Sequence, residues 1–179
     1  MSIELLATQG RDRIYGGLAA IDTFRLRHMR NEALRNCFVR FDEADSRLEY
    51  VARIHGIEFI NDAAARSVNA TWYALQRTEG TVIWIAFGGD SQADYARLRS
   101  LALRKVRMLV CVGSDNRQLH EAFDDVVPTV VDAESIGAAV HAACYSGIEG
   151  AKVLFSPATR QGLSDETAAI LFRREVNEL

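Results

Sequence analysis

Apolar and polar positions alternate with a strand-like period at residues 48–61 and with a helix-like period directly afterwards. "LEYVARI" (48–54) and "IEFIN" (57–61) are two β-rich runs joined by His55-Gly56. This two-residue loop predicts a tight hairpin, because glycine takes a positive φ freely. A helix is predicted from about Val68, because Val68, Trp72 and Leu75 recur at helical spacing and share one face.

The same alternation continues to the end of the chain. It predicts strands over 81–87, 107–113, 125–131 and 151–157, and helices over 94–105, 115–123, 133–147 and 165–179. The run "TVIWIAF" (81–87) is continuously apolar, as expected for a strand covered on both sheet faces. Asp115 is expected to cap the helix at 115–123, and Pro128 directs its strand toward an edge of the sheet.

Regular alternation of strands and helices predicts an α/β fold. We expect a Rossmann-like, mostly parallel sheet with helices on both faces, and the first hairpin as an antiparallel edge. The first 40 residues have helical periodicity without a strand partner. We therefore expect a short helical appendage at 1–40 and an α/β domain at 41–179.

Composition narrows the classes of function. The chain has 179 residues, of which 49% are hydrophobic and 25% charged, with a net charge of −3. This is enough to bury a core, and no basic patch of the kind that nucleic acid requires is visible. The start carries no signal-peptide pattern, and no run of 18 apolar residues occurs, so we expect a cytoplasmic protein without a membrane partner.

Cysteine and histidine spacing gives no metal motif. Cys37, Cys111 and Cys144 are far apart in apolar surroundings, which indicates buried, reduced thiols. The four histidines form no ligand pattern with them or with each other. We therefore expect no metal site from the sequence.

Ligands of open α/β sheets bind beyond the carboxyl ends of the strands. The candidate ends here are Asn61-Asp62, "FGGD" (87–90), "VGSD" (112–115) and "SPATRQG" (156–162). Glycines at such ends suit the close approach of a ligand. The pattern contains neither G-x-G-x-x-G nor a P-loop. The residues alone therefore leave the class of ligand open.

Several segments together resemble a known family. The segments are "GRDRIYGGLAA" (10–20), "SRLEYV" (46–51), "INDAAARSVNAT" (60–71), "IAFGGDSQADY" (85–95) and "VLFSPATRQG" (153–162). They resemble the Mur ligases of peptidoglycan biosynthesis, most closely the C-terminal domain of the D-glutamate-adding (MurD) type. The resemblance implies a domain that brings the amino acid and part of the nucleotide site to an ATP-dependent ligase. The UDP-binding and ATPase domains of that family have no counterpart in the residues given.

The resemblance fails at the positions whose side chains serve catalysis and substrate binding in the family. A Ser-Lys pair of the family corresponds to Ala63 and Ala64, and a lysine that helps to hold glutamate corresponds to Ser91. Losing these cations weakens an anion pocket. We expect no catalytic residue and no activity from this chain alone, which would make it a pseudoenzyme or a binding module. Because alanine favours helix, we also predict that the helix begins near residue 63, with Asp62 as its N-cap.

Six residues are candidate ligand contacts. By resemblance, Arg47 and Asp62 lie on the phosphate and ribose side of ATP or ADP with Mg²⁺, the only cofactor implied. The alternatives are that Arg47 pairs with a surface acid and that Asp62 only caps a helix. Arg66 is either an anion contact at the helix start or a solvated side chain. Asp90, Ser91 and Ser156 are further candidates, with turn and strand-end roles as the alternatives.

Two other functions stay open. The chain is the C-terminal half of a split ligase, completed by a separate Mur ligase-type chain as protein partner, or it is an α/β protein that binds an unrelated small ligand. The two missing lysines argue against the split ligase.

Overall fold

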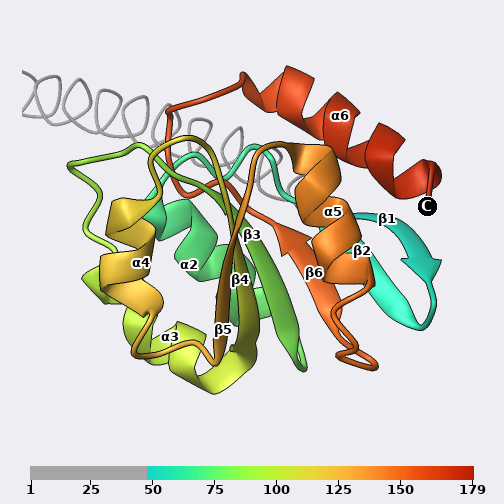
Figure 1. The fold of residues 1–179 in the computed structure, drawn as a ribbon, viewed down its shortest axis with the longest axis horizontal. Coiled ribbons are helices and arrows are strands. Elements are labelled where there is room, and N and C mark those ends of the chain that lie inside the picture. Colours follow the sequence, from blue (N-terminus) through green and yellow to red (C-terminus); the bar gives the residue numbers. More distant parts are fainter. Residues whose placement is uncertain (1–47) are drawn as a thin grey trace, which may run out of the picture. The chain divides into compact units, whose positions relative to one another are not determined.

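The computed structural model describes residues 48–179 and shows one six-stranded sheet with the order β1-β2-β6-β3-β4-β5 (Figure 1). The strands are β1 (Glu49–Ile54), β2 (Ile57–Asn61), β3 (Val82–Phe87), β4 (Val106–Val112), β5 (Thr129–Ala133) and β6 (Lys152–Phe155). The helices are α2 (Val68–Arg77), α3 (Ala96–Lys105), α4 (Arg117–Phe123), α5 (Ile136–Cys144) and α6 (Asp165–Asn177). The predicted α/β class is confirmed.

Within residues 48–179, β1 and β2 pair in antiparallel fashion, and the other strand pairs are parallel. The predicted hairpin is present at His55-Gly56. Both turn residues have positive φ, 50° and 83°, as a two-residue hairpin loop of this kind requires. The hairpin adds β1 at one edge of the sheet, and β5 forms the opposite edge.

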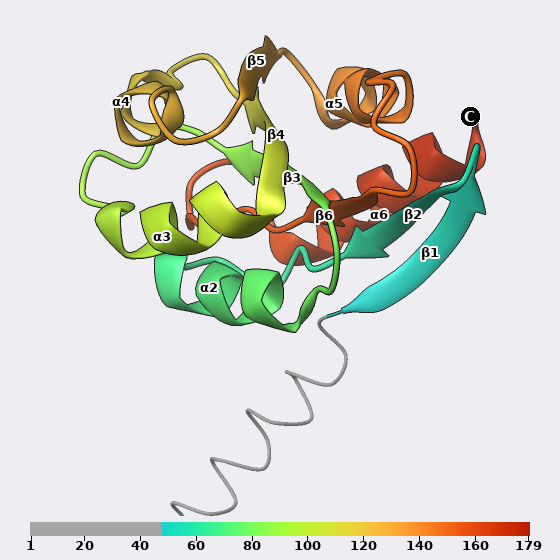
Figure 2. The same cartoon turned by 90° about the horizontal axis from the view of Figure 1, so that it is seen from below.

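Helices cover both faces of the sheet, as the sequence predicted. Figure 2 shows α2, α3 and α4 on one face and α5 and α6 on the other. Every residue of β3 is buried, which explains its continuous apolar run. Trp84 of β3 packs edge-on against Phe123 of α4, so the α4 end of the domain is fixed to the centre of the sheet.

The start of α2 confirms the prediction from apolar spacing and contradicts the one from the alanines. The helix begins at Val68 and not near residue 63, and its N-cap is Ser67, whose Oγ accepts the N–H of Ala70. The carbonyl of Ala65 accepts the N–H of Ala158, 2.9 Å away, in the segment after β6. This hydrogen bond joins the β2–α2 turn to the segment after β6. It holds the alanines in a turn and overrides their helix propensity.

Two other boundaries differ from the expectations. β5 is an edge strand as expected, but Pro128 precedes it. Asp115 does not cap α4: Asn116 occupies the N-cap position, and the Asp115 carboxylate pairs with Arg117 at 3.0 Å. Among residues 48–179, no helix has the length and apolarity to cross a membrane. The helical appendage expected at 1–40 lies outside the described residues.

Candidate functional site

Because β2, β6, β3, β4 and β5 all run parallel, their carboxyl ends lie together at one end of the sheet. The loops that follow these strands form two regions. We call the region after β2, β6 and β3 the inner end, and the region after β4 and β5 the outer end. Five of the six candidate residues lie at the inner end, and Arg47 lies outside the described residues.

A buried hydroxyl of Ser156 is the centre of the inner end. Its Oγ lies 2.8 Å from Oγ1 of Thr71 and donates to Oδ2 of Asp62 at 3.2 Å. Its carbonyl accepts the indole N–H of Trp84 at 2.8 Å. Ser156 and Thr71 are fully buried and Asp62 is 2% exposed. Ser156 and Asp62 therefore join β6, α2 and the β2 loop, and neither side chain is presented to solvent.

The turn between β2 and α2 is bonded within the protein. The N–H of Ala63 donates to Oδ1 of Asn61, and the N–H of Ala65 donates to the carbonyl of Asp62. Ala63 and Ala65 are buried, and Ala64 is exposed. Asp62 is thus part of this turn and does not serve as a helix cap.

Arg66 connects the start of α2 to the segment after β6. Its guanidinium donates to the carbonyl of Leu163 at 2.8 Å and to the carbonyl of Arg160, and it lies 3.5 Å from Asp165. Its side chain is only 20% exposed. The expectation of a solvated arginine is therefore wrong, because three groups of the chain surround this guanidinium.

Asp90 and Ser91 lie in the loop after β3. Asp90 closes a turn by accepting the N–H of Gln92 at 3.1 Å, and its second oxygen accepts the hydroxyl of Thr159 at 3.0 Å. Ser91 is exposed, and its carbonyl accepts the side-chain amide of Gln118. The structure thus shows Asp90 in the turn role that the sequence offered as its alternative.

A hollow of about 370 Å³ lies beside these loops, between the starts of α2 and α3. Its basic side chains are Arg66, Arg97 and Arg160. Arg97 pairs with Asp94 at 3.1 Å, and Arg160 is exposed. The hollow carries mixed charge, because Asp90 and Asp94 line it as well.

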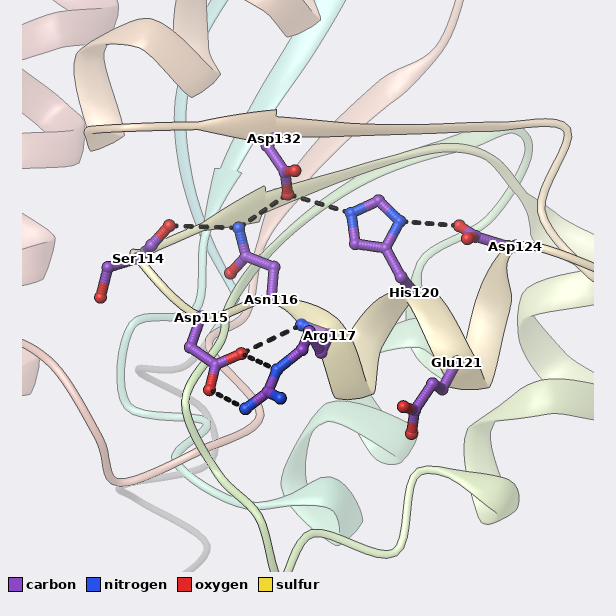
Figure 3. Close-up of a pocket in the computed structure, with 9 residues that line it drawn as sticks. Ser114, Asp115, Asn116, Arg117, His120, Glu121, Asp124 and Asp132 are labelled. Carbon is purple, nitrogen blue, oxygen red and sulfur yellow. Dashed lines mark hydrogen bonds and ion pairs between the residues drawn. The ribbon is translucent and has the colours of Figure 1, made fainter.

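The outer end holds a larger open hollow, of about 750 Å³, between the β4–α4 loop, α4 and β5 (Figure 3). His120 of α4 lies between two carboxylates. Its Nε2 is 3.0 Å from Oδ1 of Asp132 and its Nδ1 is 2.9 Å from Oδ1 of Asp124. The hydrogen bond to Asp132, followed by the one to Asp124, raises the pKa of His120, and the same imidazole lowers the pKa of Asp132.

The side-chain amide of Asn116 holds Asp132 in its position beside His120. Its side-chain N–H₂ donates to Oδ1 of Asp132 at 2.7 Å and to the carbonyls of Cys111 and Gly113 at 3.2 Å. The amide lies close against Gly88, where a Cβ would meet the carbonyl of Asp115 at 2.5 Å. Gly88 therefore permits the close approach of the protein's own β4–α4 loop.

The sequence alone indicated no role for His120, Asn116 or Asp132. They come from α4, from the loop before it and from β5, and only the β4-α4-β5 crossover brings them together. The segment "DNRQLH" (115–120) carried the only local signal, since it puts an amide and an imidazole one helical turn apart.

Comparison with known proteins identifies relatives but no matching family model. A UDP-N-acetylmuramoylalanine–D-glutamate ligase of Porphyromonas gingivalis is 38% identical over 158 residues, which cover 88% of this chain and 35% of that protein. The ligase of the same name from Christiangramia forsetii is 36% identical over 153 residues, covering 86% and 34%. The one from Bacteroides fragilis is 37% identical, covering 88% and 36%.

The chain is therefore a relative of one region of the D-glutamate-adding Mur ligases, as the resemblance indicated. It spans about a third of the length of the curated relatives that it matches.

Proposed function

We propose that this chain, a relative of one region of the UDP-N-acetylmuramoylalanine–D-glutamate ligases, does not catalyse ligation by itself and acts as a cytoplasmic binding module. The module corresponds to the domain that contacts amino acid and nucleotide in the family. One observation carries the proposal. The only cation of the β2–α2 turn, Arg66, is committed to two backbone carbonyls and to Asp165.

Phosphate and carboxylate groups are bound by free cationic side chains or by free N–H groups at a helix start. At the turn before α2 the family lysine is replaced by Ala64, an exposed residue without charge. In the loop after β3, the second family lysine is replaced by the exposed Ser91. Both positions are exposed, so they have space for a longer side chain but carry no charge.

The remaining polar groups support the same conclusion. Ser156 bonds to both Asp62 and Thr71 in the core, and Asp90 bonds to its own turn and to Thr159. These contacts hold the fold at the inner end. A module of this kind would act through a protein partner, for which a separate Mur ligase-type chain is the candidate.

The first test is calorimetric titration of the full chain with Mg-ADP and then with D-glutamate at low salt. We expect no binding of either. The matched variant is Ala64→Lys with Ser91→Lys, which restores the two family lysines at exposed positions. We expect this variant to gain affinity for one or both ligands, because each lysine supplies a point charge.

Micromolar binding by the unaltered chain would contradict the proposal. A phosphate-release assay then separates the two alternatives. Release that needs both this chain and a separately supplied ATPase chain would establish a split ligase. An unexpected molecule that stays bound to the purified chain would instead support the alternative of an unrelated small ligand.

A further inference from the structure

The outer end brings together three side chains whose chemistry the proposed function does not use. Cys111 of β4 and Asp132 of β5 are cross-strand neighbours, and His120 of α4 lies over the same face of the sheet. The Sγ of Cys111, a ring nitrogen of His120 and a carboxylate oxygen of Asp132 all lie within 4.8 Å of one another. We propose that these three groups bind a divalent transition-metal ion of the zinc class, with a fourth coordination position open to the hollow.

The donor set and its spacing fit such an ion. Zinc takes sulfur, imidazole nitrogen and carboxylate oxygen together in a tetrahedral site. Two nitrogen or oxygen ligands at the usual metal distance lie about 3.3 Å apart in a tetrahedron. His120 Nε2 and Asp132 Oδ1 are 3.0 Å apart, so they already have close to the spacing of two ligands of one ion. The three ligand atoms, which all lie within 4.8 Å of one another, need a modest approach to share one ion.

Two further residues position the ligands. A metal-binding histidine usually donates its second ring N–H to a carboxylate, which fixes the ring and its tautomer. Asp124 holds Nδ1 of His120 in this way at 2.9 Å. The side-chain amide of Asn116 holds Oδ1 of Asp132 at 2.7 Å. Figure 3 shows the imidazole between Asp124 and Asp132, with Asn116 beside them.

The charge of the hollow favours a cation. Among the described residues that line it are four carboxylates and one guanidinium, that of Arg117, which is paired with Asp115. Burial, followed by the fields of Asp132 and Asp124, raises the pKa of the Cys111 thiol to about 12. The thiol therefore keeps its proton in the metal-free protein. The incoming ion forms a bond to sulfur and releases that proton, and it also takes the place of any proton between Nε2 and Asp132.

The test is titration of the full, reduced chain with Co²⁺, which reports sulfur ligation as a near-ultraviolet charge-transfer band. We expect the band in the unaltered chain, its loss when Zn²⁺ is added, and its absence in Cys111→Ala. Cys144→Ala and Cys37→Ser are the matched controls, because each removes another thiol and should leave the band intact. Equal bands in the unaltered chain and in Cys111→Ala, or no band at all, would overturn the proposal.

The other residues give a graded result. Asp124→Asn should lower the affinity for Zn²⁺ by about 10–100-fold, as the loss of an outer-shell partner does. His120→Gln and Asp132→Asn should lower it at least as much, in competition with a chromophoric chelator. Asp132 and His120 are not buried, so these variants should still fold. Zn²⁺ should raise the Tm of the unaltered chain but not that of His120→Gln, and an equal rise in both would contradict the site.

Discussion

The inner end and the outer end both lie where the parallel strands terminate, yet they use their polar residues in opposite ways. At the inner end, the hydroxyl of Ser156 bonds to the hydroxyl of Thr71 and to the carboxylate of Asp62 in the core. At the outer end, an imidazole and several carboxylates line an open hollow of about 750 Å³. Polar residues after parallel strands therefore do not identify a ligand site by themselves. Such residues can bind a ligand only where their hydrogen-bonding capacity is not already used within the protein.

The position of each strand in the sheet explains the difference. β6 and β3 have strands on both sides, and the loops that follow them pack on each other: the N–H of Phe87 donates to the carbonyl of Pro157. β5 is an edge strand, so Asp132 has a strand on one side only, and its side chain is 62% exposed. The outer end thus retains groups that a cation can reach.

The largest effect is expected at the centre of the inner end. Ser156→Ala removes the donor to Asp62 and the partner of Thr71, and it should destabilise the chain by about 1–3 kcal/mol, because buried polar groups lose a hydrogen bond. Urea unfolding measures the difference. Ser91→Ala, at an exposed serine of the neighbouring loop, should change stability by less than about 0.5 kcal/mol. Equal costs for both variants would mean that the inner end is not a buried network.

A smaller effect is expected from the arginine that joins α2 to the segment after β6. Arg66→Ala should cost about 1 kcal/mol, because charge-assisted bonds to carbonyls are lost at a site that is partly exposed to solvent. Amide exchange in residues 160–164 should become faster. Arg66→Lys should recover only part of the loss, since an ammonium lacks the planar fork that reaches two carbonyls.

The control for Arg66 is Arg97→Ala, which removes a guanidinium that is paired with two surface groups, Asp94 and Asn69. It should change stability by less than about 0.5 kcal/mol. If Arg66→Ala had no larger effect than Arg97→Ala, Arg66 would be available to ligands, and the inner end would resemble the outer one.

Local sequence signals predicted the fold well. The hairpin follows from His55-Gly56, and the buried β3 follows from its apolar run, since both depend on residues that are neighbours in the chain. The apolar spacing also placed the start of α2 at Val68, but the helix propensity of the alanines wrongly predicted a start near residue 63. The carbonyl of Ala65 is held by Ala158, and only the folded sheet brings these two residues together.

The same limit applies to the candidate sites. The sequence directed attention to Asp62, Ser156 and Arg66, whose side chains the structure shows bonded within the protein at the inner end. Cys111 was predicted to be a buried, reduced thiol, and the structure shows it buried. Its neighbours His120 and Asp132 come from other elements, so their spacing along the chain carried no metal signal.

The smallest effect concerns acid stability beside the outer end. The guanidinium of Arg99 on α3 forms two hydrogen bonds to Asp125, at 2.9 and 2.6 Å, and these bonds lower the pKa of Asp125. A carboxyl with a lowered folded-state pKa adds stability above its unfolded value of about 3.9, and this stability is lost as the pH falls through the folded value. Asp125→Asn should therefore lower stability near neutral pH and leave it unchanged at strongly acid pH.

Both partners of this pair are exposed, so the difference should be modest and should shrink at high salt. Urea midpoints measured from neutral to strongly acid pH would show it as a convergence of Asp125→Asn with the unaltered chain below about pH 4. Thr71→Val at the inner end provides the contrast, because it removes a hydroxyl that does not titrate and should not converge in that way. A constant gap for Asp125→Asn at every pH would show that its carboxylate acts through packing and not through its charge.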